Sequence, residues 1–538
     1  MSPKYATRLA VHLNISHEVA WTPTARYARA HSSRTMRWRI LFLTMLLCSG
    51  WFRARGTPLR LVVLDADSRQ PVACRIHLKN AAGRAMRGGK LPFWRDHFVC
   101  PGTVELDLEP GDYAYELDRG PEYLVRTGKV TVVESSRQVI TNRIQRLVNL
   151  SREGWWSGEL HVHRPVADIE LLMQAEDLHV APVVTWWNNR NPWTNGTPSN
   201  PLVRFDDNRF YHLMGGEDER GGGALLYFNL PRPLAITVAA REFPSPMKFL
   251  AEARREAHAW VDIEKPFWYD APVWLASGQV DSIGIAHNHM HRGGVLPNEA
   301  WGRPRDQQRF PDPQGNGFWT QEIYYHALNC GLRLPPSAGS ASGVLPNPVG
   351  YNRAYVRVEG DLSYEVWFAG LKAGRVFVSN GPLLRCRANG QWPGHVFTIR
   401  NGNTLEVEMT ATLVSRDPIA AIEIVRDGKV AMTIRGPEWK QTGALGTIRF
   451  EDNGWFLVRA MADVPDTFRF ASTGPFYVEK HPETRRISRA SAQFFLDWVR
   501  ERMNLIKLED SREREEVLQH HRMAERFWQA KLDQANAD

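Results

Sequence analysis

The sequence predicts a multidomain protein in which a central α/β domain lies between two β-sandwich domains and a helical tail follows. A chain of 538 residues is longer than one hydrophobic core normally spans, and usual domain sizes suggest roughly three or four units. We divide it into a leader (1–55), a β-sandwich (56–147), a central domain (148–385), a second β-sandwich (386–480) and a helical tail (481–538).

Short alternating runs carry the prediction of the first β domain. Apolar and polar residues alternate over 59–64, 73–78, 104–108 and 130–133, with turn residues between the runs. A period of two indicates strands, and several short strands at this spacing favour a small β-sandwich. The pattern resembles the carboxypeptidase-regulatory or immunoglobulin-like modules of exported enzymes.

The C-terminal part repeats this logic and then changes period. Asp427-Gly428 lies between two alternating runs and is a strong hairpin signal. Beyond about residue 488 the apolar residues recur at helical spacing, as in Phe494 and Trp498, and Glu509-Asp510-Ser511 offers a helix cap before a second apolar stripe. The tail is therefore expected to be helical and to pack on another domain.

Positive charge is concentrated at the N-terminus. The net charge is +8, but residues 1–60 hold ten Lys and Arg against the single acidic residue Glu18, so the remaining chain is nearly neutral. A nucleic-acid-binding surface needs basic residues on the folded part. We therefore expect no nucleic-acid partner.

The basic stretch resembles a secretory signal. Arg37-Trp38-Arg39 precedes an apolar run over 40–48, which is too short to span a bilayer. We expect Met36 to be the true start, export to the periplasm or the outside of the cell, and no membrane span in the mature chain; the alternative is a membrane-anchored N-terminus. After export, Cys74 and Cys100 are candidates for a disulfide within one β domain.

The central domain alternates apolar strands with helix-like segments such as 168–177 and holds the residues suited to chemistry. Its sharpest signal is the run 155–163, WWSGELHVH. Two His at positions i and i+2 of a strand point to the same side, so His161 and His163 can reach one metal ion.

The segment 158–163 is similar to the first motif of PHP-domain metal-dependent hydrolases. Further similarity at 183–188, 216–218, 332–340 and 374–382 indicates the carbaryl-hydrolase-like branch of that family. The resemblance implies a distorted βα barrel, with metal ligands at its C-terminal mouth, flanked by β modules.

Several ligand positions of that family are altered. Where PHP proteins commonly place Thr-Asp-His, this chain has Thr185-Trp186-Trp187, and where they end with Gly-Ser-Asp-x-His it has GSASG at 339–343. The family Glu that often bridges two metals maps to Glu217. The resemblance therefore implies a reduced centre instead of three metals.

Other residues can complete a smaller site. His287, His289 and His291 alternate and, if extended, would share one face; the alternative is a surface patch or packed histidines. Glu264 falls near a family His-Pro position and is a substitute ligand, with Lys265 as a substrate contact; the alternative for both is an ordinary ion pair.

These residues predict a metal-dependent hydrolase. About one or two Zn, Mn or Fe ions per chain suit such imidazole and carboxylate ligands, and the resemblance implies attack of metal-activated water on a carbonyl or phosphoryl centre. Lys265 and His291 are the candidates for proton transfer. The expected ligands are His161, His163, Glu217, Glu264, His287 and His289.

Tryptophan gives the hint about substrate. Five of the 20 Trp residues, at 155, 156, 186, 187 and 193, fall near the predicted mouth, which favours a small organic ester or carbamate or a carbohydrate-linked phosphoester. The alternative is that they pack in the barrel rim. The altered ligand motifs also support a second functional hypothesis, a non-catalytic envelope protein with a degenerate PHP-like fold that binds glycans or partner proteins.

Overall fold

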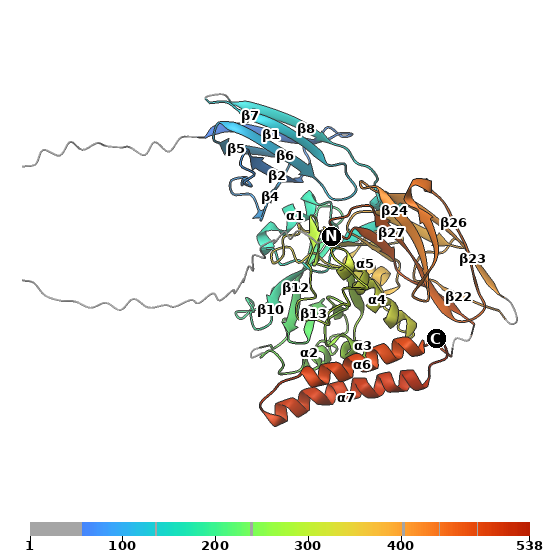
Figure 1. The fold of residues 1–538 in the computed structure, drawn as a ribbon. Helices are drawn as coiled ribbons and strands as arrows, with labels where there is room; N and C mark the ends of the chain where they lie inside the picture. The colour runs from blue at the N-terminus through green and yellow to red at the C-terminus, as the bar shows by residue number, and fades with distance from the viewer. Residues whose placement is uncertain (1–55, 135–136, 237–239, 401–403, 441, 481–482) are drawn as a thin grey trace, which may run out of the picture. The chain divides into compact units, whose positions relative to one another are not determined.

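The computed structural model describes residues 56–538 except 135–136, 237–239, 401–403, 441 and 481–482 (Figure 1). This part of the chain is a mixed α/β protein with more strand than helix and with several sheets, as the sequence predicts at that level. The expected leader, with Met36, lies outside the described residues. In the described ranges, no helix combines the length and the apolar character that crossing a bilayer requires.

Residues 57–144 form two sheets around one core, with strand orders β5-β1-β8 and β3-β4-β2-β6-β7. Leu61, Ile76 and Leu106 are each at most 3% exposed and share this core. Every second side chain of β1 and β5 points into it, which explains the alternation in the sequence. The strands are β1 (Thr57–Asp65), β2 (Cys74–Asn80), β3 (Phe93–Trp94), β4 (His97–Cys100), β5 (Thr103–Leu108), β6 (Gly111–Asp118), β7 (Arg126–Val132) and β8 (Gln138–Ile144).

Cys74 and Cys100 lie opposite each other in this β domain. They are register partners in the antiparallel pair β2–β4, and both side chains are completely buried. Both are free thiols in the structure, so the disulfide considered from the sequence is not formed. Burial raises the pKa of Cys100 to about 11, which favours the protonated thiol at neutral pH.

The central region supplies most of one large sheet. Its strands are β9 (Trp155–Gly158), β10 (Val180–Trp187), β11 (Leu202–Phe205), β12 (Arg209–Arg220), β13 (Gly223–Phe228), β14 (Trp260–Ile263), β15 (Ser282–Ala286), β18 (Pro336–Ala338), β19 (Arg353–Arg357) and β20 (Val376–Ser379). Between them lie the ribbon of β16 (Met290–His291) and β17 (Gly294–Val295) and the helices η1 (Ser151–Glu153), η2 (Val166–Asp168), α1 (Ile169–Ala175), α2 (Pro246–Ala253), α3 (Ala271–Ser277), α4 (Gly315–Asn329) and α5 (Tyr364–Lys372). The predicted helix at 168–177 is α1.

The first strands of this sheet follow the order β18-β15-β14-β13-β12-β10-β9. Past β9 the chain stays extended, and Val162 bridges both Val183 and Ser342 in parallel. The amide of Leu160 donates to the carbonyl of Ala338 at 2.9 Å, and that of His163 to Ser342 at 2.8 Å. Segment 160–163 therefore joins the two ends of this strand series.

The C-terminal β region continues the large sheet, because β20 pairs with β28. A separate sheet, β21-β23-β26, shares its core through Leu384, Val407 and Phe456. Asp427 and Gly428 turn between β24 and β25 with φ angles of 49° and 84°, which confirms the predicted hairpin. The elements are β21 (Leu383–Ala388), β22 (Val396–Thr398), β23 (Leu405–Val414), β24 (Ile419–Arg426), β25 (Lys429–Arg435), η3 (Gly436–Glu438), β26 (Thr442–Phe450), β27 (Gly454–Ala462), β28 (Phe470–Thr473) and β29 (Phe476–Glu479).

Two helices end the chain, α6 (Arg489–Leu505) and α7 (Ser511–Asp533), and they lie side by side (Figure 1). The Asp510 side chain accepts hydrogen bonds from two amides of the first turn of α7, as the sequence predicts for a cap. Trp528 is completely buried, stacks on Phe495 at 4.5 Å and donates its Nε1 hydrogen to the Pro272 carbonyl at 2.9 Å. The tail is thus packed against α3.

Buried ion pairs connect the first β domain to the rest. Arg75 of β2 lies 2.5 Å from Asp118 and forms a second ion pair with Glu176, which follows α1. Arg416 reaches Asp118 from the C-terminal region at 2.8 Å. Because an unpaired buried charge is costly, these pairs fix which surfaces of the β domain contact the central and C-terminal regions.

Replacing Trp528 tests the packing of the tail. We expect Trp528→Ala to lower the free energy of unfolding by about 3–5 kcal/mol, because it leaves a large cavity and an unpaired carbonyl. Met523→Ala on the same helix, where the side chain is 54% exposed, is the matched control and should change it by less than about 1 kcal/mol. Urea unfolding followed by circular dichroism measures both, and equal effects would contradict the packing described.

Candidate metal centre

Two histidines enter the site from one extended segment. His161 and His163 flank Val162, whose bridges hold the backbone extended, so both imidazoles point to the same side. The neighbouring segment 339–343 approaches very closely. A Cβ at Gly339 would lie 2.4 Å from the Cβ of His161, and one at Gly343 would lie 2.4 Å from the carbonyl oxygen of His163. Glycine at these two positions permits the approach.

Glu217 of β12 supplies a third ligand atom. Its Oε2 lies 3.1 Å from Nε2 of His163 and 3.5 Å from Nε2 of His161, and the two Nε2 atoms are 2.9 Å apart. His161 and Glu217 are only 3% and 2% exposed. These three residues, called here the His-His-Glu group, place their ligand atoms within 4.8 Å of one another and could hold a metal ion.

The electrostatics of the His-His-Glu group favour a cation. Burial opposes protonation of His161, but the carboxylates of Glu217 and Glu264 outweigh it and raise the pKa of His161 to about 10. Burial likewise opposes ionisation of Glu217, yet the two imidazoles lower its pKa to about 2. Burial lowers the pKa of His163. In the absence of a metal ion, the carboxylates therefore favour a proton on His161.

Glu264 lies on the other side of the His161 ring. It follows β14, and its Oε1 is 3.2 Å from Nδ1 of His161, the nitrogen that faces away from Glu217. Its Oε2 accepts a hydrogen bond from Nε1 of Trp268 at 2.9 Å and forms an ion pair with Lys265. Although burial raises the pKa of Glu264, Lys265 and His161 hold it well below its usual range. Glu264 therefore orients His161, and Lys265 is paired with it.

The three alternating histidines do not share a face. The amide of Met290 donates to the carbonyl of His287, so the chain turns here instead of running extended. In His287, Nδ1 accepts from the amide of His289 at 3.3 Å and Nε2 lies 2.8 Å from Oγ1 of Thr320. Both ring nitrogens of His287 are therefore engaged.

His289 and His291 make other contacts and are not members of the His-His-Glu group. His289 packs against Phe267, with ring centroids 5.4 Å apart, and burial depresses its pKa strongly. His291 lies on β16 and lines a cavity of about 650 Å³ together with Arg292. The structure thus brings His161, His163, Glu217 and Glu264 together, and His287, His289 and His291 are not members of the group whose ligand atoms lie within 4.8 Å of one another among the described residues.

A tryptophan ring lies beside His163. The ring of Trp187 lies 5.1 Å from that of His163, whereas Trp186 is buried and stacks on Tyr227. Trp155 is buried in the C-terminal core. Of the five tryptophans expected near the mouth, at least Trp155 and Trp186 pack in cores, and Trp187 is the one with a ring contact to the His-His-Glu group among the described residues.

Two carboxyl groups near the site were missed by the sequence analysis. Glu219 lies two residues after Glu217 on β12, and burial together with the negative charge of Glu217 raises its pKa to about 8. The spacing alone could have indicated it, because β alternation puts both side chains on one face. Glu159 accepts hydrogen bonds from the amides of Ser340 and Gly350 and so holds the glycine-containing segment beside His161.

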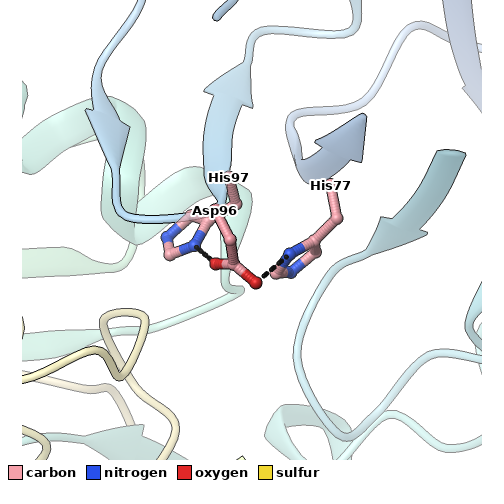
Figure 2. A group of neighbouring side chains, drawn as sticks. All are labelled: His77, Asp96 and His97. Atoms are coloured by element: carbon pink, nitrogen blue, oxygen red, sulfur yellow. Dashed lines mark hydrogen bonds and ion pairs between the residues drawn. The ribbon is translucent and has the colours of Figure 1, made fainter. Parts of the chain in front are cut away.

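A second group in the described residues places ligand atoms within 4.8 Å, and it could also hold a metal ion. It consists of His77, Asp96 and His97 in the first β domain (Figure 2). Asp96 lies between the two rings, with its oxygens 3.1 Å from Nδ1 of His77 and 3.0 Å from Nδ1 of His97. Arg75 donates to Nε2 of His77 at 3.1 Å, so the ring's hydrogen is on Nδ1, pointing to Asp96.

Comparison with known proteins adds little. No protein-family model matches the chain, and no curated protein matches its sequence. Among solved structures, the structure of the Streptococcal ancillary pilin is similar at 18% identity over 21% of this chain and 38% of that chain, with a TM-score of 0.14. That similarity is too slight to indicate a shared fold.

The position of Glu264 generates a prediction. We expect Glu264→Gln to weaken divalent metal binding about 10- to 100-fold, because the partner that orients His161 loses its charge. Glu406→Gln, on the exposed face of β23, is the matched control and should bind as the wild type does. Competition with a chromophoric chelator measures the affinity, and circular dichroism checks that both variants fold. Unchanged affinity in folded Glu264→Gln would contradict this role.

Proposed function

We propose that the protein is an exported metal-dependent hydrolase that cleaves a small organic ester or carbamate or a carbohydrate-linked phosphoester. The observation that carries the proposal is the convergence of two Nε2 atoms and one carboxylate oxygen in the His-His-Glu group. The resemblance of segment 158–163 to the first PHP motif supports the same chemistry. The closed strand series, with His161 and His163 in the joining segment, is compatible with the expected PHP-like distorted βα barrel.

The donor set fits a first-row divalent ion. Two imidazole nitrogens and one carboxylate oxygen suit Zn, Mn or Fe, and three protein ligands leave positions for other molecules. A divalent ion bound there would polarise a carbonyl or phosphoryl group and make water more acidic. The carboxylates of Glu217 and Glu264 raise the pKa of His161, and the two imidazoles lower that of Glu217, so the group attracts positive charge, which a divalent ion would also supply.

The residues around the His-His-Glu group would orient its ligands and contact the substrate. Glu264 fixes the ring of His161 through Nδ1, which leaves Nε2 directed at Glu217. Lys265 is committed to Glu264 and packs over Trp268 at 4.4 Å, and His291 faces another cavity. In the part of the chain that the structure describes, neither of these two candidates for proton transfer forms a hydrogen bond or an ion pair with the His-His-Glu group. Trp187, beside His163, offers an aromatic wall for an organic substrate.

A non-catalytic envelope protein is the second candidate function. The observation in its favour is that Trp187 packs against His163 where the family resemblance calls for a ligand. The almost complete burial of His161 and Glu217 points the same way, because a substrate would need a path to them. In that case the His-His-Glu group is a structural ion pair, and the protein binds glycans or partner proteins elsewhere.

Metal content separates these functions. We expect untagged protein purified without chelators to retain about one metal ion per chain by mass spectrometry, and His161→Ala/His163→Ala to lose it. His395→Ala is the control, because that histidine lies outside both groups that could hold a metal and contacts Phe397. Metal-free wild type would favour the non-catalytic function.

Activity is tested on the metal-loaded protein. We expect the wild type to hydrolyse a nitrophenyl ester, carbamate or phosphoester slowly and His161→Ala/His163→Ala to be inactive. Chelation should abolish the activity of the wild type, and added metal should restore it. Hydrolysis that survives in the double variant would show that the activity belongs to another site or to a contaminant.

A further inference from the structure

The cavity beside Arg292 differs in character from the candidate metal centre. Its volume is about 650 Å³, and its wall combines residues of the first β domain, the β16–β17 ribbon and the 346–348 loop. We propose that it binds an acidic, hydroxyl-bearing ligand of the sugar-acid or sugar-phosphate class, with the charged end against Arg95, Arg292 and Arg469. A cavity of this size suits a ligand of one or two sugar units.

Positive charge dominates the wall of this cavity. Three arginines line it, at 95, 292 and 469, whereas Asp96 is the one acidic residue among its described lining residues. Arg95 is exposed, and the described residues offer it no ion-pair partner within 4 Å. Guanidinium groups carry several N–H donors in one plane and match carboxylate and phosphate oxygens.

The other two arginines are held in place by carboxylates outside the cavity wall. Arg292 forms an ion pair with Glu116, and Arg469 holds Asp417 with two contacts of 2.8 and 2.9 Å. A further nitrogen of Arg469 donates to the carbonyl of Arg292 at 2.9 Å. These contacts use only some of the donors, because each guanidinium has five N–H groups. The remaining donors are preorganised.

The carboxylate of Asp96 is already committed. Figure 2 shows it between His77 and His97, whose Nδ1 atoms lie 3.1 and 3.0 Å from its two oxygens. Two N–H donors hold the pKa of Asp96 well below its usual range against the effect of burial, so it stays ionised and satisfied. Asp96 thus leaves the arginine donors to a ligand.

The surroundings of His77, Asp96 and His97 also make these three residues a poor site for a metal cation. Nε2 of His77 faces two guanidinium groups, those of Arg75 at 3.1 Å and Arg292 at 3.2 Å. A metal on Nδ1 would move the ring's hydrogen to Nε2, where it would meet these two donors, and would bring a cation close to two positive charges. The surroundings therefore favour an anion over a metal ion.

Two residues that line the cavity also carry buried polar atoms without a partner among the described residues, and these atoms suggest the rest of the ligand. Oδ1 of Asn347 and Nε2 of His291 are buried, and neither has a hydrogen-bond partner among the described residues. Asn347 is only 1% exposed, and its Nδ2 already donates to the carbonyls of Asn288 and Met290. An amide oxygen accepts hydrogen bonds, so it suits a ligand hydroxyl and not a second anionic group. An acid that carries hydroxyl groups meets both requirements.

Calorimetric titration at low ionic strength tests the proposal with three probes: glucuronate, glucose 6-phosphate and glucose. We expect at least one acidic sugar to bind and neutral glucose not to bind, and the stronger acidic probe identifies the carboxylate or the phosphate class. Arg292→Gln and Arg95→Gln should each weaken binding about tenfold or more, because each removes a charge-assisted contact. Arg137→Gln, in the same β domain with a side chain 67% exposed, should bind as the wild type does.

The outcomes distinguish ligand binding in this cavity from metal binding at the His-His-Glu group or at His77, Asp96 and His97. Binding that persists in His161→Ala/His163→Ala supports the cavity, because none of the His-His-Glu residues lines it. Absence of binding by both acidic sugars, or equal affinity in wild type, Arg292→Gln and folded Arg95→Gln, would overturn the proposal. A second result would also overturn it: a zinc ion that His161→Ala/His163→Ala retains and that is lost when Asp96→Asn is added. That result would show that His77, Asp96 and His97 bind a cation.

Discussion

Backbone hydrogen bonds on both sides of residues 160–163 are the constraint on which the candidate metal centre depends. Val162 bridges Val183 on one side and Ser342 on the other, so the segment is extended and has no freedom to turn. An extended segment places His161 and His163 on one side. The same hydrogen bonds join β18 to the start of the strand series. Glu264, which follows β14, contacts the imidazole of His161.

The cost of burying an unpaired charge explains how the buried charged side chains are paired. Arg75 pairs with Asp118 and Glu176, and Lys265 pairs with Glu264, because a buried charge without a partner would be far more costly than the pair. Around the His-His-Glu group, compensation is incomplete without an added positive charge, and His161 takes a proton despite its burial. The carboxylates of Glu217 and Glu264, which raise the pKa of His161, would attract a metal cation for the same reason.

The sequence predicted local structure better than it predicted the site. Period-two runs, the Asp427-Gly428 hairpin and the Asp510 cap depend on neighbours within a few residues, and the structure confirms them. Spacing and family resemblance grouped His161, His163 and Glu217 as ligands, and in the structure their ligand atoms lie within 4.8 Å of one another. This proximity depends on pairing between distant strands.

The turn at the histidines after β15 could not be predicted from the sequence. A turn at His287 to Met290 replaces the extended run, and the carbonyl of Met290 is held by side chains from the 347–352 region. Nothing in the local pattern HNHMH distinguishes a strand from such a turn. The ion pair of Glu264 with Lys265, which the sequence offered as the alternative for both residues, is present in the structure. The position of Lys265 over Trp268 depends on tertiary packing and could not be predicted.

The two imidazole groups show why residue types alone do not define a metal site. Both contain two histidines and one carboxylate with ligand atoms within 4.8 Å. At the His-His-Glu group, the far nitrogen of His161 faces the carboxylate of Glu264, which leaves Nε2 free to bind a cation. At the other group, the far nitrogen of His77 faces Arg75 and Arg292, which fix the hydrogen on Nδ1. The charge of the group that contacts the second ring nitrogen therefore determines which ligand is favoured. A carboxylate at that nitrogen favours metal binding by the imidazole, whereas guanidinium groups there favour a bound anion nearby.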